Sequence, residues 1–378
     1  MRIIGSERIF NASHGEREFN VVERIKKLPA VSPDIILSPE CKYDKNGDLT
    51  GLMFRSEGAK NAVAYPGLVP DNGCGFCLGS VKGIPENFTG WDGLSRVLIH
   101  AGGVYSPERR KIMPDDILDV ALRGLSETSG FLSDLKRDET LPVLLKQPFG
   151  CFLGHFLEIR KVENSENDEH ILIIHSGSQG VHRLLNNIIH DKYGYHSRVY
   201  GAELNTNEGA DRKIAVQIAM NYAKASRLFA FEIICGCLNS FTGAETTFLS
   251  DVFHSYIQYE DSGVLHCRGI QNFDCAFNDI SFPRYLLAGT QATSSYLMEP
   301  KTKAGSICHG TPEIFYAEPE CEKFDPPDTL AWRDTPPDGD ARIFESATRD
   351  LARSFESQGT AKITARLLPV FNMQKADR

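Results

Sequence analysis

The strongest constraint on the fold is a pair of strand-like runs joined by a short polar turn. The runs HFLEIRKVE (155–163) and EHILIIHSG (169–177) are rich in apolar and β-branched residues, and the NSEND between them is a cluster of turn formers. This pattern predicts an antiparallel hairpin. The turn places His155 opposite His175, and residues opposed in this way have Cβ atoms ~5 Å apart. The hairpin alone allows two interpretations, a pair of structural histidines at the end of a sheet or two ligands of one metal ion.

Helical periodicity elsewhere adds helices to this sheet and predicts an α+β fold. Apolar residues recur at helical spacing over 210–234, and the segment 113–127 opens with two aspartates suited to a helix start. The segment 250–260 is also interpreted as helical, which places His254 on a helix. Residues 341–370 indicate a helix that returns to a final strand. We expect one large domain over 1–378, with antiparallel sheets and packed helices, and an exposed excursion at the proline-rich, acidic stretch 318–340.

Composition excludes several classes of protein. With 41% hydrophobic residues in 378, the chain can form a large core, and its net charge of −9 argues against binding nucleic acid by bulk attraction, although a local basic groove stays possible. No run approaches the roughly 20 apolar residues that cross a bilayer. The start of the chain has no apolar targeting segment, so we expect a cytoplasmic protein without a membrane partner. The ten cysteines are spread too widely for a disulfide framework.

The stretch HSGSQG, from His175, joins the second strand of the hairpin to a helical pattern. A turn of small residues at a helix start presents free backbone N–H groups, which suit a phosphate. Glycine and serine are also common in such turns for steric reasons alone. Both interpretations stay open for this turn.

Six short motifs in collinear order give the chain a clear resemblance to one family. They are DNGCG from Asp71, GHFLEI from Gly154, HSGSQG from His175, FHSY from Phe253, AGTQATSSY from Ala288 and CHG from Cys308. Together they resemble the RtcB-type RNA ligases, over the chain from about residue 60 to its end.

The resemblance implies an RtcB-like catalytic domain that depends on manganese and GTP. Such an enzyme joins RNA ends with a 2′,3′-cyclic phosphate or 3′-phosphate to 5′-OH ends in the repair of tRNA or rRNA. It acts through a His–GMP intermediate and RNA(3′)pp(5′)G, and His309 is implied as the nucleophile. We expect it to act as a monomer.

The same resemblance implies a ligand set and a nucleotide site. Two Mn²⁺ ions are expected, with Cys74 bridging them and the ligands Asp71, Cys74, His155, His175 and His254. This mixture of imidazole, carboxylate and thiolate also suits Zn²⁺. The expected contacts to GTP are Gly154, Glu158, Ser255, Ala288, Gly289, Thr290, Gln291, Ser295, Gly310 and Lys375.

The CxxC pair in PDNGCGFC (70–77) also invites a zinc or redox interpretation. A CxxC zinc site requires a second such pair, and the other close pair, Cys235 and Cys237, has the wrong spacing. A redox CxxC opens a helix, whereas the LGSVKGI that follows Cys77 predicts a strand. We therefore interpret Cys74 as a metal thiolate and Cys77 as part of the core.

The chain departs from the family pattern mainly at residues that contact phosphate. Two asparagines and two arginines that the resemblance leads one to expect are replaced, and a stacking tyrosine is absent. The residues at these places are Gly154, Ser255, Gln179, the segment Thr311–Glu313 and Thr348, and Lys375 matches the terminal lysine only with a one-residue shift. Two other classes of function stay open, a metallohydrolase that opens cyclic phosphates and a non-catalytic RNA-binding protein.

Overall fold

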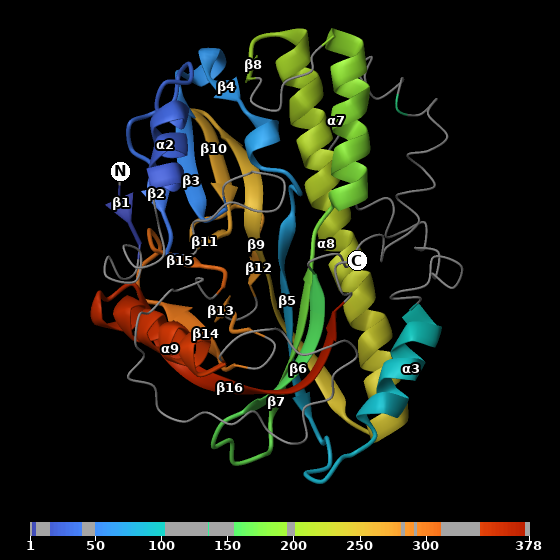
Figure 1. Cartoon of the computed structure of the whole chain (residues 1–378). Coiled ribbons are helices and arrows are strands. Elements are labelled where there is room, and N and C mark those ends of the chain that lie inside the picture. Colours follow the sequence, from blue (N-terminus) through green and yellow to red (C-terminus); the bar gives the residue numbers. More distant parts are fainter. Residues whose placement is uncertain are drawn as a thin grey trace.

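The computed structural model describes residues 2–4, 16–39, 50–102, 135, 155–194, 201–280, 284–290, 293–310 and 341–374. Within these residues the chain forms a twelve-stranded sheet, two small sheets and several helices (Figure 1). The α+β class and the mostly antiparallel pairing expected from the sequence are confirmed. Among the described helices, none combines the length and the apolar character needed to cross a bilayer.

The large sheet runs from the N-terminal strands, through the hairpin, to the C-terminal strand. Its strands in spatial order are β1 (Arg2–Ile3), β2 (Ile36–Leu37), β3 (Leu52–Glu57), β10 (Gly263–Arg268), β9 (Glu245–Glu260), β5 (Cys74–Lys82), β7 (His170–Ser176), β6 (Phe156–Val162), β16 (Ala361–Gln374), β14 (Ser295–Pro300) and β13 (Tyr285–Leu287), with β12 (Asp279–Ile280) beside β9. The small sheets pair β11 (Ile270–Asn272) with β15 (Ser306–Cys308), and β4 (Val63–Ala64) with β8 (Ala202–Glu203).

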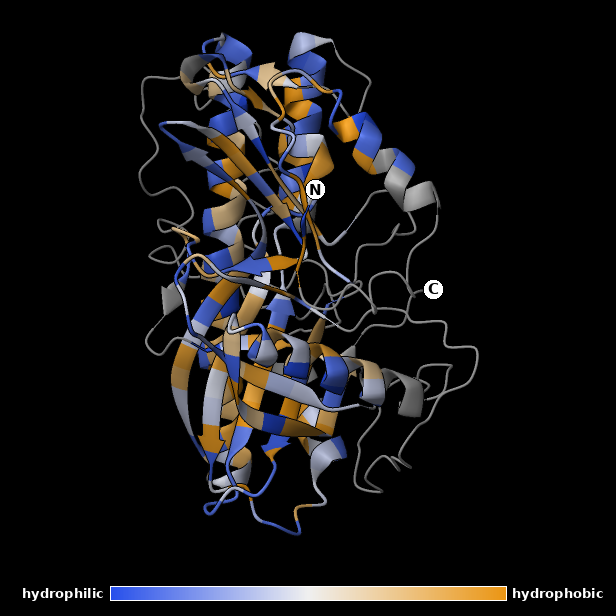
Figure 2. Ribbon diagram, turned by 90° about the vertical axis from the view of Figure 1, so that its left-hand side faces the viewer, coloured by the Kyte–Doolittle hydropathy of each residue, from blue (hydrophilic) through white to orange (hydrophobic). Residues whose placement is uncertain are grey.

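Helices pack on one face of the curled sheet and near both of its ends. They are α2 (Glu16–Ile25), α3 (Trp91–Gly102), α7 (Gln179–Tyr193), α8 (Asn207–Thr242) and α9 (Ala341–Ser357), with the short 3₁₀ turns η1 (Ala59–Asn61) and η2 (Pro66–Leu68). The long α8 packs against β5, β7 and β9 and carries α3 and α7 beside it, while α9 packs on β16. Figure 1 shows α8 running along the sheet and β16 curving below the other strands. Figure 2, turned by 90°, shows hydrophobic residues along both strands and helices.

The two faces of β7 lie in different cores, as strand pleating requires. Leu172 and Ile174 are buried against α8, whereas Ile171 and Ile173 lie in an apolar cluster on the other face with Phe76. His175 continues the second series. The end of β7 therefore directs this imidazole to the face of the sheet away from α8.

The hairpin predicted from the sequence is confirmed, with a register one residue from the expected one. β6 and β7 pair Phe156 with His175, so His155 lies just before the first paired residue of β6. The two imidazole rings are still neighbours, with centroids 4.9 Å apart. The helix and strand expected over 341–370 are α9 and β16, and the strand expected after Cys77 is β5.

The helix expected over 210–234 is α8, which extends further at both ends. It begins after Thr206, whose side chain accepts a hydrogen bond from the N–H of Gly209, and it ends at Gly243 in the left-handed conformation. The predicted helix at 113–127 and the excursion at 318–340 lie outside the described residues.

The prediction of a helix around His254 is wrong, because this histidine lies in the middle of β9. β9 lies between β10 and β5 near the centre of the sheet, and Val252, Phe253, Tyr256 and Ile257 are all buried. A strand covered on both faces has no alternating polar side, so its apolar run resembles a buried helix.

Candidate metal centre

A tight turn before β5 brings two of the expected ligands together. Asp71 and Gly73 both adopt positive φ angles, of 63° and 91°, and the N–H of Cys74 donates to the carbonyl of Asp71 at 3.1 Å. A Cβ on Gly73 would overlap Ala223 of α8, so glycine allows the turn to lie against that helix. The turn thus directs Asp71 and Cys74 to the end of the hairpin.

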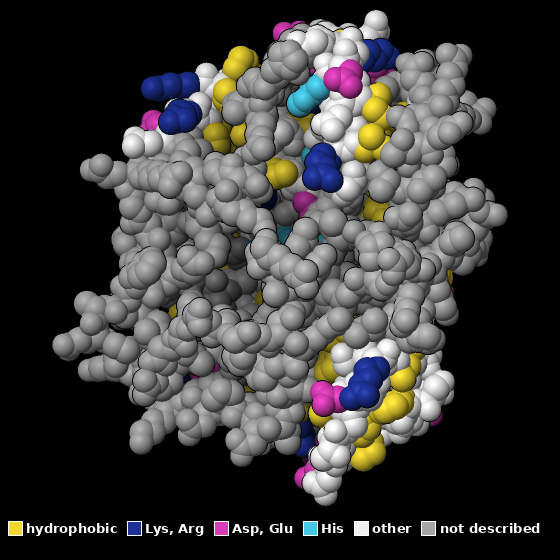
Figure 3. Space-filling model, turned by 45° about the vertical axis from the view of Figure 1, so that its right-hand side comes forward, with side chains coloured by type: hydrophobic (Ala, Val, Ile, Leu, Met, Phe, Trp, Pro, Cys, Tyr) yellow, Lys and Arg dark blue, Asp and Glu magenta, His cyan; other side chains and the backbone are white. Residues whose placement is uncertain are grey.

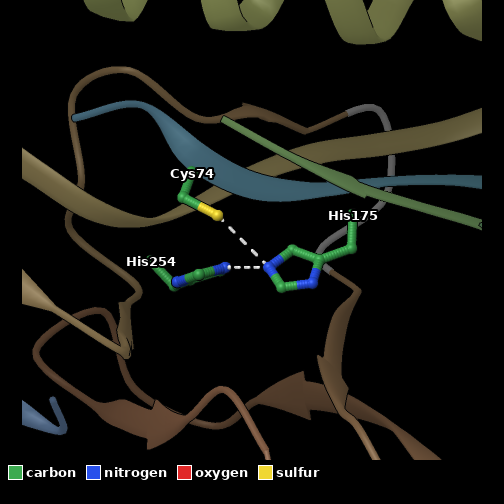
Figure 4. A group of neighbouring side chains, drawn as sticks. All are labelled: Cys74, His175 and His254. Atoms are coloured by element: carbon green, nitrogen blue, oxygen red, sulfur yellow. Dashed lines mark hydrogen bonds between the residues drawn. The ribbon is translucent and has the colours of Figure 1, made fainter. Parts of the chain in front are cut away.

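The five expected ligands, which come from four separate stretches of sequence, converge at this point. The Sγ of Cys74 lies 3.1 Å from Nε2 of His155 and 3.2 Å from Nε2 of His175. Nε2 of His175 lies 3.0 Å from Nε2 of His254, which β9 contributes. Oδ2 of Asp71 lies 3.1 Å from Nε2 of His155. Figure 4 shows the side chains of Cys74, His175 and His254 pointing toward one another from three neighbouring strands.

These donor atoms form two groups of three that share the thiol of Cys74. One group is Asp71, Cys74 and His155, and the other is Cys74, His175 and His254. A divalent cation lies ~2.0–2.3 Å from such donors, a distance that fits between atoms this close together. The three histidines and Cys74 are buried and the Asp71 side chain is 21% exposed. Both groups can therefore hold a metal ion, whose identity the donor types leave open.

Burial sets the protonation of the cluster in the metal-free protein. Burial, followed by the neighbouring imidazoles, lowers the pKa of His175 and His254 well below the usual value, so both rings are neutral and have a lone pair to offer. Burial also raises the pKa of the Cys74 thiol. Burial opposes a charge on His155, but Cys74 and Asp71 outweigh it and raise the pKa of that ring. A bound cation would displace the protons held here.

His309 lies beside the cluster but outside both groups of donor atoms. Its ring stacks on His254, with centroids 4.3 Å apart and planes 28° apart, and its centroid lies 5.9 Å from that of His175. It is partly exposed, unlike the buried histidines of the two groups. The carbonyl of His309 accepts a hydrogen bond from the N–H of Ala288 at 3.2 Å, which ties this segment to the loop after β13.

Among the described residues expected to contact GTP, the polar groups bond to other parts of the protein. Both oxygens of Glu158 accept hydrogen bonds at 2.6 Å, one from Nε of Arg160 and the other from Nδ2 of Asn372. The hydroxyl of Ser295 accepts from the N–H of Gly289 at 2.8 Å.

The other expected GTP contacts divide between the described and undescribed parts of the chain. Ala288 forms a bridge with Gly310, and the N–H of Thr290 donates to the hydroxyl of Thr293 at 2.8 Å. The hydroxyl of Ser255 lies 3.3 Å from Nδ1 of His254. Three more of these residues, Gly154, Gln291 and Lys375, lie outside the described residues.

Sequence reasoning missed several residues that surround the ligands. Gly177 lies directly against the Asp71 carboxylate, which a Cβ at this position would overlap. Asn72, next to Asp71, donates to the carbonyl of Val69 at 2.9 Å and contacts Nδ1 of His182 at 3.3 Å. The buried ion pair of Arg227 and Asp251 lies nearby as well. The sequence carries no clear signal for this pair, because α8 and β9 contain several other charged and polar residues.

The fold and this cluster define an α+β protein with a buried candidate metal centre. Searches against protein-family models and against curated proteins find no match for the chain.

Proposed function

We propose that this protein is a metal- and GTP-dependent RNA ligase of the RtcB type, which joins 2′,3′-cyclic phosphate or 3′-phosphate ends to 5′-OH ends. The observation that carries the proposal is the convergence of the five residues that the resemblance implied as ligands. Asp71, Cys74, His155, His175 and His254 form two donor groups that share one sulfur atom. These two groups would hold two adjacent ions, which the resemblance implies to be Mn²⁺.

His309 is the proposed nucleophile. A nitrogen of its imidazole attacks the α-phosphorus of GTP, a P–N bond forms and pyrophosphate leaves. A 2′,3′-cyclic end is first opened by water, which breaks the P–O2′ bond and leaves a 3′-phosphate and a 2′-OH. The RNA 3′-phosphate then displaces the histidine to give RNA(3′)pp(5′)G, and the 5′-OH finally displaces GMP. The bound cations supply positive charge that neutralises the phosphates in these steps. The partial exposure of His309 and its contact with His254 support this role rather than that of a further ligand.

The charges of the chain favour recognition of an RNA end over nonspecific binding. The net charge is −9, and on the face in Figure 3 the described lysine and arginine side chains lie among acidic ones rather than in one basic patch. Binding of random RNA should therefore be modest and should fall only gently with salt. The RNA chosen for repair in the cytoplasm is expected to be a nicked tRNA or rRNA with suitable ends.

The test is incubation of the protein with Mn²⁺ and GTP labelled at the α-phosphate. The wild-type protein should acquire a covalent GMP that is labile in acid and stable in alkali. His309→Ala should lose this adduct and the joining of 3′-phosphate ends, yet should bind Mn²⁺ with nearly unchanged affinity and seal RNA supplied as RNA(3′)pp(5′)G. His254→Ala is the matched control, because it removes a ligand and should lose metal binding together with sealing.

Each other outcome rejects part of the proposal. If His309→Ala still acquires labelled GMP, His309 is not the nucleophile. If the wild-type protein opens cyclic phosphates without a GMP adduct, the protein is a hydrolase. If it forms no adduct and changes no RNA end, it is at most a binding protein.

A further inference from the structure

One buried arginine lies directly behind the candidate metal centre. Arg227, on the face of α8 toward the sheet, is fully buried and makes four hydrogen bonds. Its Nε and Nη2 donate to the two oxygens of Asp251 at 2.6 and 2.9 Å. Its Nη1 donates to the carbonyls of Gly73 at 2.6 Å and Ser176 at 2.8 Å.

The partners of Arg227 lie in or directly before the three strands that carry candidate metal ligands. Gly73 precedes Cys74 at the start of β5, Ser176 follows His175 at the end of β7, and Asp251 lies on β9 upstream of His254. One guanidinium group therefore connects the backbone next to two ligands with the strand of a third.

The backbone pairing of these strands becomes irregular where Arg227 bonds to them. The last pair between β5 and β7 is Gly75 with Ser176. The register of β5 against β9 shifts between Cys74 and Gly75. The two hydrogen bonds of Nη1 connect Gly73, which lies just beyond the last pair, with Ser176, which is in that pair, and so reinforce the end of the ladder next to Cys74 and His175.

A charged pair at this position is not needed to fill the core. Removing an ion pair from water is costly, and an apolar side chain of similar volume often stabilises a fold as well or better. The planar guanidinium group, in contrast, holds several acceptors in a fixed geometry, which no apolar side chain can do. The acceptors that Arg227 holds are the Asp251 carboxylate and the carbonyls next to Cys74 and His175.

We propose that Arg227 is the positioning residue of the metal centre and, with Asp251, fixes the spacing of Cys74, His175 and His254. The inference rests on the proposed metal centre, but not on the ligase reaction. Loss of Arg227 should leave every ligand present but let the ends of β5 and β7 move apart. Residues that orient metal ligands typically contribute about 10- to 100-fold to metal affinity.

The test is titration of the full chain with Co²⁺, followed by its visible d–d bands and by its thiolate-to-metal absorption. The variants are Arg227→Lys and the double variant Arg227→Met with Asp251→Leu, which leaves no uncompensated charge. Arg212→Met is the matched control, because Arg212 is also buried on α8 but pairs with Glu208 on its own helix. Folding is checked by circular dichroism and by melting in the presence of EDTA.

The folded double variant should bind Co²⁺ at least about 10-fold more weakly and with shifted d–d bands. Arg227→Lys keeps the positive charge but lacks the planar guanidinium group, so its d–d bands should shift less, in the same direction. This variant serves as the test if the double variant does not fold. Arg212→Met should give the wild-type affinity and spectrum.

A wild-type affinity and spectrum in folded Arg227 variants would overturn the inference. Changes as large in Arg212→Met would overturn it too, because they would show a general effect of losing a buried charge. A wild-type chain that binds no Co²⁺ would remove the metal centre and this inference with it. Normal Co²⁺ binding without GMP transfer would reject the ligase and leave the positioning role intact.

Discussion

Two sets of buried histidines in this protein differ in what their nitrogens contact. His266 stacks on Phe54 with centroids 4.4 Å apart, and its Nε2 accepts the N–H of Tyr65 at 2.9 Å. In the candidate metal centre, Nε2 of His175 instead faces Nε2 of His254 and the sulfur of Cys74. Equal burial thus goes with two different roles. The His266 nitrogen satisfies a backbone N–H and so serves the fold. The nitrogens of His175 and His254 and the sulfur of Cys74 instead face one another, as the donors of a cation site do.

The largest expected effect separates the two cysteines of the CxxC pair. Cys74→Ser removes the donor that both groups share, so affinity for Mn²⁺ or Co²⁺ should fall by more than about 100-fold, beyond the loss typical of outer residues. Cys77→Ser is the control, because Cys77 lies in the apolar core between the sheet and α8. It should lower the melting temperature and leave metal affinity nearly unchanged. Equal losses of affinity in the two variants would contradict the shared-sulfur arrangement.

The next effect compares His175 with His266 through the free energy of unfolding, measured with and without metal. A cation at about 100 times its dissociation constant should raise the free energy of unfolding by about 3 kcal/mol. His175→Gln should lose most of this gain, because its nitrogen belongs to the donor set. His266→Gln should be destabilised in both conditions but keep the gain. Denaturant unfolding with EDTA or Mn²⁺ measures both, and a full gain in His175→Gln would remove this residue from the site.

The sequence could predict local structure better than the arrangement of side chains around the candidate ligands, which were implied by the resemblance. The hairpin followed from a turn cluster between two strand-like runs, and the pleat then brought His175 to the correct face. Both depend on residues close together in sequence. The strand that carries His254 was mistaken for a helix, because burial on both faces removes the alternation that marks a strand.

Long-range hydrogen bonds could not be predicted from local pattern at all. Arg227 bonds to carbonyls of Gly73 and Ser176, and any residue type offers a carbonyl, so these acceptors leave no trace in the sequence. The bond between Glu158 and Asn372 is also hidden from local pattern, because it depends on the pairing of β6 with β16.

A smaller effect concerns the acid sensitivity of the structural histidine. Burial lowers the pKa of His266 to about 3, whereas in the unfolded chain it is ~6.5. Below pH 6.5 the unfolded chain therefore binds a proton that the folded protein does not, and the free energy of unfolding falls as the pH falls toward 3. Between pH 7 and 5 the contribution of His266 is about 2 kcal/mol. Denaturant unfolding at pH 7 and pH 5 measures this difference. Between these pH values, the free energy of unfolding of His266→Gln should fall by about 2 kcal/mol less than that of the wild-type protein. Equal decreases in the two proteins would show that the fold does not keep His266 neutral.

The smallest expected effect tests whether Asp71 belongs to the metal centre, and it uses two glycines that flank the start of α7. A Cβ on Gly177 would lie 2.6 Å from Cγ of Asp71, whereas a Cβ on Gly180 has no neighbour within 4 Å. Neither glycine adopts a positive φ in the left-handed range, so alanine is compatible with the backbone at both positions. Gly177→Ala should displace the Asp71 carboxylate and weaken metal binding by about 10-fold, the scale of a disturbed ligand rather than a lost one.

Gly180→Ala should bind metal like the wild-type protein and, because alanine is favoured in a helix, melt at the same or a higher temperature. Isothermal titration with Mn²⁺ compares the two variants and also gives the number of ions bound. A loss of one ion in Gly177→Ala would place Asp71 in one of two distinct sites. An unchanged affinity and stoichiometry would instead show that the Asp71 carboxylate lies beside the ion without binding it, and that the donor set is the thiol and the histidines alone.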